Sequence, residues 1–320
     1  MTKVLLSRRW PEEAERAVAA RYDVTLNEAD RPLTPAQLRE AMQSFDVLCP
    51  TVTDRIDAAV LQAPNRRVRL IANFGAGVDH IDLEAARAAG LRVSNTPGVL
   101  TDATADLALM LILMATRRAG EGERELRAGR WTGWRPTHLL GSGLAGRTLG
   151  ILGFGRIGQA LAARARPLGL TIAYHGRSRA PHEVEGRLGA TYYASPEALA
   201  EASDVLSLHV SGGAASRHLV DKSLLARMKP TAVLINTARG SVVNEADLAQ
   251  ALQDGAIAAA GLDVFESEPK VHAELLRCEN AVLLPHLGSA TRETRVAMGL
   301  RTLANIDAFF DAGELLDRAC

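Results

Sequence analysis

The chain has 320 residues, which is long enough for two domains of ordinary size. It carries 37 Lys and Arg against 37 Asp and Glu, so its formal net charge is zero and it lacks the basic excess of nucleic-acid-binding proteins. The longest apolar run, 107–115, is too short to cross a bilayer, and residues 1–9 do not resemble a signal peptide. The three cysteines form no C-x-x-C pair, so we expect no disulfide framework and no metal site, and free thiols favour a cytoplasmic location.

Short apolar runs alternate with helical patterns in the first 98 residues. Strands are expected at 4–6, 24–26, 47–49, 70–72 and 91–93, and helices beginning at Pro11 and covering 35–42 and 83–89. Strands separated by helices predict a parallel sheet with helices on its faces.

A turn-rich break at 95–98 precedes a long, largely apolar helix expected over 102–117. A helix that is apolar on most sides is a buried one, so this helix could lie between two domains. The next segment, 120–146, contains several glycines and the tryptophans Trp131 and Trp134. We expect it to be a long loop with a functional or interface role.

The second half of the chain repeats the alternation of strand and helix. Strands are expected at 148–152, 170–174, 205–208, 232–235, 258–262 and 281–284, and helices at 159–168, 196–202, 222–228, 245–253 and 293–310. The last helix must return to the first domain or stand alone. The fold class predicted is therefore α/β, with two doubly wound parallel sheets.

A glycine turn joins the strand at 148–152 to the helix that follows it. Gly153 permits the tight turn, Gly155 lets a pyrophosphate approach the backbone, and Gly158 allows close packing of helix and strand. Free N–H groups at the helix start would then face the phosphates. The alternative is a glycine-rich turn with no ligand.

The end of the second strand in this unit suggests which dinucleotide is bound. NAD-binding units usually place an acidic residue there for the ribose 2′-hydroxyl, whereas this chain has Gly176, Arg177, Ser178 and Arg179. Two guanidinium groups and a hydroxyl suit a 2′-phosphate, and Gly176 leaves room for it. We therefore expect NADPH to be preferred; the alternative is a solvated basic loop.

Three further segments follow predicted parallel strands, at the edge where α/β sheets bind ligands. Arg239 in N-T-A-R-G could bind a carboxylate and polarise a carbonyl, and His286 in L-P-H-L-G could donate a proton. Glu268, in the segment 261–269, would favour the imidazolium form of His286. Asp263 in the same segment could serve only as a structural cap.

Together these motifs resemble the D-isomer-specific 2-hydroxyacid dehydrogenase family over nearly the whole chain. They are the G-x-G-x-I-G turn, N-T-A-R-G, G-L-D-V-F-x-x-E-P and L-P-H-x-G-S-A-T. The resemblance implies that Arg239, Glu268 and His286 are catalytic. It also implies a Rossmann cofactor domain, 99–288, inserted in a flavodoxin-like substrate domain made of 1–98 and 289–320, and a homodimer formed through 99–147.

The resemblance also implies the binding residues. The loop with Phe74, Gly75, Ala76 and Gly77 would hold the substrate, its carboxylate on the N–H groups of Ala76 and Gly77, with Arg239 and His286 beside it. Cofactor contacts are implied, besides the glycine turn and the basic loop, for Thr104, Arg156, Ile157, His209, Thr237, Ala238, Arg239, Asp263, His286 and Gly288. The loop after His209 departs from the family pattern, because a frequent proline two residues later is absent.

Within the family, the chain is most similar to the glyoxylate and hydroxypyruvate reductases in two segments, 131–136 and 176–179. In that group a tryptophan such as Trp134 reaches the substrate site of the partner subunit. The alternative is that the tryptophans only pack in the interface. The expected activity is NADPH-preferring reduction of glyoxylate and hydroxypyruvate to D-2-hydroxy acids, with NAD as a possible cofactor. Alternatives are reduction of larger acids such as 2-ketogluconate, a cofactor-binding co-repressor, or oxidation of formate or phosphite.

Overall fold

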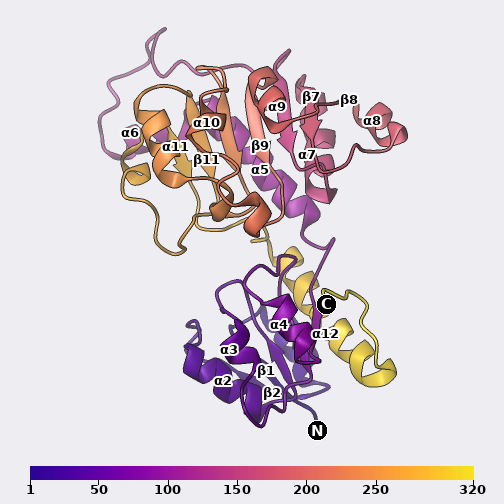
Figure 1. Ribbon diagram of the computed structural model, residues 1–320. Coiled ribbons are helices and arrows are strands. Elements are labelled where there is room, and N and C mark those ends of the chain that lie inside the picture. The colour runs from indigo at the N-terminus through magenta and orange to yellow at the C-terminus, as the bar shows by residue number, and fades with distance from the viewer. The chain divides into compact units, whose positions relative to one another are not determined.

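A computed structural model describes all 320 residues, and the chain divides into two compact units. The first unit comprises Met1–Leu100 together with Ser289–Cys320, and the second comprises Thr101–Gly288. In Figure 1 the first unit contains both the indigo start and the yellow end of the chain. The polypeptide thus leaves the first unit once, builds the second, and returns.

The first unit is built on a five-stranded sheet in which every strand pair is parallel, with the order β2-β1-β3-β4-β5. This is the order of the flavodoxin-like doubly wound folds. The strands are β1 (Lys3–Leu6), β2 (Asp23–Leu26), β3 (Val47–Cys49), β4 (Leu70–Ala72) and β5 (Arg92–Ser94). All five predicted strands are confirmed.

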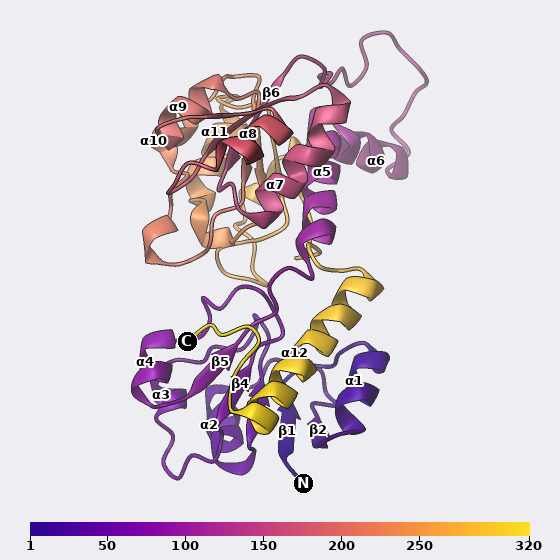
Figure 2. The same ribbon diagram turned by 90° about the vertical axis from the view of Figure 1, so that its right-hand side faces the viewer.

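Successive side chains of this sheet enter two hydrophobic layers, because strand residues alternate between faces. Leu5, Leu48 and Ile71 pack in one layer, and Leu6 and Leu70 pack in the other. The first layer is covered by α2 (Pro35–Ser44), α3 (Ala58–Leu61) and α4 (Leu83–Ala88), and the second by α1 (Glu12–Ala19) and α12 (Arg292–Ala312). Figure 2 shows α12 beside α1. The final helix therefore completes the first unit.

The second unit contains a seven-stranded sheet, again wholly parallel, with the order β12-β11-β10-β9-β6-β7-β8. The order reverses between β6 and β9, which is the switch point where doubly wound sheets bind ligands. The strands are β6 (Thr148–Leu152), β7 (Thr171–His175), β8 (Ala190–Tyr192), β9 (Val205–Leu208), β10 (Val233–Asn236), β11 (Ala259–Leu262) and β12 (Ala281–Leu283).

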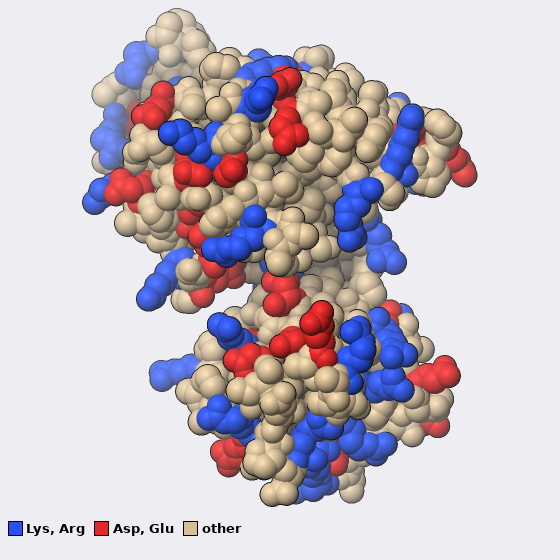
Figure 3. Space-filling model, viewed as in Figure 1, with Lys and Arg blue, Asp and Glu red and all other residues tan.

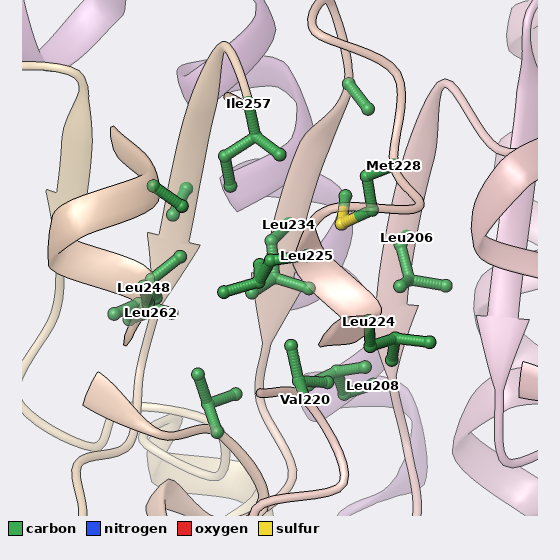
Figure 4. Packing of buried hydrophobic residues seen from close by; sticks show 14 of the residues in the cluster. Leu206, Leu208, Val220, Leu224, Leu225, Met228, Leu234, Leu248, Ile257 and Leu262 are labelled. Atoms are coloured by element: carbon green, nitrogen blue, oxygen red, sulfur yellow. The ribbon is translucent and has the colours of Figure 1, made fainter. Parts of the chain in front are cut away.

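Helices cover both faces of this sheet. In Figure 4, Leu206, Leu234 and Leu262 project from their strands toward Leu225 and Leu248. The helices on that side are α9 (Pro196–Ala202), α10 (Lys222–Leu225) and α11 (Glu245–Gln253), and those on the other side are α5 (Thr101–Thr116), α7 (Arg156–Ala165) and α8 (His182–Leu188). Four 3₁₀ turns complete the unit: η1 (Arg166–Leu168), η2 (Ala214–Ser216), η3 (Gly240–Val242) and η4 (Leu275–Arg277).

The segment expected to be a loop over 120–146 is partly helical, and that prediction was wrong for its first part. The helix α6 (Ala119–Arg127) occupies it, and 128–146 contains neither helix nor strand. Ion pairs of Arg118 with Glu121 and of Arg127 with Glu123 support the helix at i,i+3 and i,i+4 spacing. These pairs offset only part of the poor helix propensity of its two glycines, Gly120 and Gly122.

Three further helices or strands, α3, α8 and β8, were not predicted, and one helix was predicted too long. The helix α3 has only four residues, too few to show an apolar period. The strand β8 has three residues at the sheet edge, and the helix α8 that leads to it is mostly polar, so neither has a strong apolar period. The helix expected over 222–228 ends at Leu225. The long apolar helix α5 covers β10 and β11, but its Met110 and Leu113 are 38% and 40% exposed, so it is not buried all round within its unit.

Basic and acidic side chains occur on both units on the face shown in Figure 3, which agrees with the formal net charge of zero. None of the helices is both long enough and apolar enough to cross a membrane.

Candidate active site

The glycine turn after β6 has the geometry expected of a dinucleotide-binding turn. Gly153 has φ +98°, and a Cβ there would lie 2.6 Å from the carbonyl carbon of His209. A Cβ on Gly158 would lie 2.5 Å from the carbonyl oxygen of Gly153, so helix and turn touch through backbone. A Cβ on Gly155 would meet nothing, which leaves space beside the start of α7. The first N–H groups of α7, from Arg156 and Ile157, have no acceptor within the helix and can bind an anion.

The basic loop after β7 is held by hydrogen bonds to the buried side chain of Glu185. Glu185 accepts two hydrogen bonds from Arg179, at 2.8 and 2.9 Å, and one from the hydroxyl of Tyr174 at 2.6 Å. The bonds from Arg179 and Tyr174 lower the pKa of Glu185 to about 2. The guanidinium of Arg179 is therefore engaged by Glu185, whereas Arg177 and Ser178 are exposed and bond to no side chain. A bound 2′-phosphate would meet Arg177 without having to displace an ion pair.

His209 lies at the end of β9, against the glycine turn. Its Nε2 lies 2.9 Å from Oγ of Ser207, and burial lowers its pKa to about 4. The imidazole is therefore neutral at pH 7. In this state its ring is a polar group beside the glycine turn and carries no positive charge.

Asp263 follows β11 and braces the turn that carries His286. Its carboxylate is buried and accepts the N–H groups of Leu287 at 2.6 Å and Gly288 at 2.8 Å. Thr104 on α5 donates its hydroxyl to the carbonyl of Gly288 at 3.2 Å. Burial raises the pKa of Asp263 despite these bonds and the nearby charge of His286. The capping role considered for Asp263 is thus what its hydrogen bonds show.

The segment with Arg239 is fixed by the residue that ends β10. Asn236 accepts the N–H of Ala238 at 3.0 Å and donates to the carbonyl of Arg239 at 2.9 Å. Gly240 lies so close to the next loop that a Cβ would be 1.8 Å from the carbonyl carbon of Phe265. The hydroxyl of Thr237 is buried and has no hydrogen-bond partner in the protein. A bound ligand would satisfy it, so this orphan group fits the expected cofactor contact.

Glu268 and His286 form a hydrogen-bonded pair. Nδ1 of His286 lies 2.8 Å from Oε2 of Glu268, and each side chain is about one third exposed. Oε1 of Glu268 accepts the N–H of Phe265 at 3.1 Å. Burial acts to raise the pKa of Glu268, but the hydrogen bond and charge of His286 outweigh it and the pKa is lowered. An ionised Glu268 orients the ring and leaves Nε2 of His286 for proton transfer.

The loop expected to bind a substrate carboxylate lies in the first unit, and its backbone is turned by amide side chains. Asn73 donates to the carbonyls of Gly75 and Gly77, both at 2.9 Å. Asn95 donates to the carbonyl of Ala76 at 2.7 Å. With three successive carbonyls held in this way, the N–H groups of Ala76 and Gly77 have no protein acceptor. Adjacent free N–H groups of this kind form an anion-binding nest.

Two aromatic positions complete the predicted set. Phe74 packs on Trp10 with ring centroids 4.7 Å apart, which supports the loop from beneath. Trp134 is 82% exposed and lies in 128–146, outside any helix or strand, and Trp131 is 52% exposed. Both tryptophans are thus open to solvent in the single chain.

The residues that the sequence analysis missed are those whose side chains fix the backbone of the site loops, and they would not themselves contact a ligand. Asn73, Asn95 and Asn236 shape the loops by bonding main-chain groups. Asparagine at or directly after the end of a short strand was the available signal, because its side chain readily bonds neighbouring backbone.

Comparison with known proteins agrees with this geometry. Residues 109–288 match the family model for the D-isomer specific 2-hydroxyacid dehydrogenase NAD binding domain. Glyoxylate reductase of Thermococcus litoralis is 45% identical over 312 residues, covering 96% of this chain and 93% of the relative. Human glyoxylate reductase/hydroxypyruvate reductase is 40% identical over 310 residues, with 96% and 94% covered.

A solved structure is similar over the whole chain. The NADPH-dependent glyoxylate/hydroxypyruvate reductase of Sinorhizobium meliloti, in complex with NADP and malonate, aligns with a TM-score of 0.88 at 36% identity, covering 100% of this chain and 97% of that one. Relatives at this identity over nearly the full length establish the family. The chain belongs to the D-isomer specific 2-hydroxyacid dehydrogenase family and is an NAD(P)-dependent dehydrogenase.

Proposed function

We propose that the protein is an NADPH-preferring reductase of glyoxylate and hydroxypyruvate. The observation that carries the proposal is the hydrogen-bonded pair of Glu268 and His286, in one unit with Arg239 and the glycine turn. Curated relatives at 40–45% identity carry the name glyoxylate reductase, which supports a short 2-oxo acid as substrate.

The residues that follow β10, β11 and β12 would each have a separate role in the reduction. NADPH would supply the hydride for the keto carbon when it is bound. The guanidinium of Arg239 would bind the acid and polarise its carbonyl. His286, protonated and oriented by Glu268, would donate the proton from Nε2 to the carbonyl oxygen as negative charge develops there. Glu268 would stay ionised and hold the ring in place.

The residues present fit a dinucleotide. A phosphate would have room beside Gly155 and could accept hydrogen bonds from the N–H groups at the start of α7. The hydroxyl of Thr237, which has no partner in the protein, could bond to another part of the cofactor. Thr104, Ala238 and Gly288 would line the same edge. Asp263 would act there through the turn that it braces. Preference for NADPH would come from Arg177, with Ser178 beside it, because Arg179 is engaged by Glu185.

The loop of Asn73 to Gly77 would bind the substrate carboxylate. The free N–H groups of Ala76 and Gly77 would donate hydrogen bonds to this carboxylate, and Phe74 and Gly75 would shape the space around it. We further propose a homodimer through 99–147, where Met110, Leu113, Leu126 and the two tryptophans are exposed apolar groups. The role of Trp134 in the partner's site depends on that dimer.

The test is cofactor oxidation followed by absorbance, with NADPH and NADH in parallel, against glyoxylate, hydroxypyruvate, pyruvate and 2-ketogluconate. Fast oxidation of NADPH with glyoxylate and hydroxypyruvate, and slower oxidation of NADH with the same acids, is expected. Equal rates with both cofactors would refute the NADPH preference. Turnover only with 2-ketogluconate would refute glyoxylate and hydroxypyruvate as the substrates.

A pair of variants locates the preference. Arg177→Ala should raise the KM for NADPH about 10-fold and leave the KM for NADH unchanged, the size expected for one charge-assisted contact. Arg179→Ala removes a guanidinium of the same loop that is bound to Glu185, so it should alter thermal stability and affect both cofactors alike. A larger NADPH-specific loss for Arg179→Ala would reverse the assignment.

A further inference from the structure

Glu245 is a buried carboxylate that bonds to the segment carrying Glu268. It is the first residue of α11 and is 6% exposed. Its Oε1 accepts the N–H of Glu266 at 2.5 Å, and its Oε2 accepts the N–H of His272 at 3.0 Å. The two oxygens of one carboxylate thus hold both ends of the segment 266–272.

The start of α11 does not need this carboxylate. Asn244 caps the helix, and its side-chain oxygen accepts the N–H groups of Ala246 and Asp247, both at 3.1 Å. Acidic residues in the first turn of a helix are favourable for the helix itself, but such a residue is normally solvated. A buried Glu245 directed away from its own helix therefore acts on the neighbouring segment.

The two hydrogen bonds to Glu245 bear on the proposed active site because the segment 266–272 carries Glu268. Between the two bonds to Glu245, the chain turns sharply, with the N–H of Lys270 bonded to the carbonyl of Ser267 at 2.9 Å, and the turn carries Glu268. The side chain of Glu266 is held separately by His218 at 2.5 Å. On its other side, the backbone of Phe265 and Glu266 touches Gly240, next to Arg239. A shift of this segment would displace Glu268 from His286 and would disturb the Arg239 loop.

We propose that Glu245 is a positioning residue that fixes Glu268 against His286. The inference rests on the proposed role of that pair in proton donation. Removing the carboxylate would leave two N–H groups without their acceptor, so the segment would relax to satisfy them. Displacement of a catalytic group by about 1 Å can reduce the rate about 100-fold.

The experiment uses the full chain with NADPH and glyoxylate. Glu245→Ala should lower kcat about 10- to 100-fold while the KM for NADPH changes less than about twofold. Glu245→Gln keeps the shape but can accept only one of the two bonds, so its kcat should fall between those of the wild type and the alanine variant. If the alanine variant does not fold, the glutamine variant carries the test.

A pH profile separates positioning from general loss of structure. The charged groups acting on Glu268 are His286 and Arg239, and Glu268 in turn acts on Asp263. Loosening the pair with His286 lets the pKa of Glu268 rise toward its ordinary value. The acid limb of the kcat profile should then move to higher pH in both Glu245 variants, which a merely destabilised enzyme would not show.

Asp247→Asn is the matched control. Asp247 lies on the same helix and also accepts a backbone N–H, from Lys222 at 3.0 Å, but it does not touch 266–272. It should keep the wild-type kcat and pH profile. Wild-type values in both Glu245 variants, or equal losses in Asp247→Asn, would overturn the positioning role. Wild-type turnover in Glu268→Gln would instead overturn the proposed function.

Discussion

The two units carry their proposed binding and catalytic groups in different chemical forms. In the second unit the chemistry lies in side chains, those of Arg239, Glu268 and His286, placed at the ends of neighbouring parallel strands. In the first unit it lies in backbone N–H groups, those of Ala76 and Gly77, whose residues have no functional side chain.

The difference has consequences for how each region is held. Side chains of the second unit are braced by other side chains and by close backbone packing, as with Asp263 under the His286 turn. The loop of the first unit depends on Asn73 and Asn95, which bond its carbonyls and so expose its N–H groups. A side-chain site is destroyed by replacing its own residues, whereas a backbone site is destroyed only by replacing its supports.

The strongest test of this contrast is His286→Ala. Loss of the general acid should lower kcat about 10²- to 10⁴-fold, while NADPH binding persists because the glycine turn is untouched. Steady-state assay and cofactor fluorescence titration measure the two effects. A variant with near wild-type turnover would contradict the assigned role of His286.

The next largest effect concerns the stability of the second unit in acid. The pKa of His209 is lowered by burial from 6.5 to about 4, so between these values the unfolded chain binds a proton that the folded chain does not. Stability present above pH 6.5 is therefore lost as the pH falls toward 4, by about 3 kcal/mol at most.

His209→Gln removes this ionisation, so its free energy of unfolding should fall less steeply than that of the wild type between pH 6.5 and 4. Urea unfolding at a series of pH values measures the slope. Identical slopes for the two proteins would show that His209 is not buried in the neutral form.

The backbone site of the first unit is tested by Asn73→Ala. The carbonyl of Gly77 would lose its bond to Asn73, and that of Gly75 would keep only its bond from the N–H of Thr96. The loop should then turn, raising the KM for glyoxylate about 10-fold with a smaller change in kcat. Asn27→Ala is a matched control, since Asn27 also donates to two carbonyls in this unit, those of Ser7 and Arg31. Equal effects of the two substitutions would mean that stability, not loop geometry, had changed.

The smallest effect is expected for Glu185→Gln, because its partner Arg179 is exposed and solvent screens their ion pair. The pKa of Glu185 is lowered to about 2 in the folded state from an ordinary 4.5, so its stabilisation is present above pH 4.5 and is lost as the pH falls through 2. The stability difference between wild type and variant should therefore narrow across that range. A difference that stays constant down to pH 2 would show that the ion pair with Arg179 does not form.

The sequence alone determined the fold class and the candidate catalytic and cofactor-binding residues. Apolar runs of three to five residues separated by helical patterns are sufficient to predict parallel sheets, because buried parallel strands are apolar on both faces. The glycine turn and the strand-end Arg239, Glu268 and His286 could also be recognised, because the carboxyl ends of parallel strands share one edge.

The tertiary structure decided which polar groups are paired. Arg177 and Arg179 are equivalent in the sequence, but only Arg179 meets Glu185, since the fold of α8 brings that carboxylate beneath the loop. The same is true of Glu245, which lies 21 residues from Glu266 and looks like an ordinary first-turn acid of a helix. Pairings between residues distant in the chain depend on packing, and no local pattern encodes them.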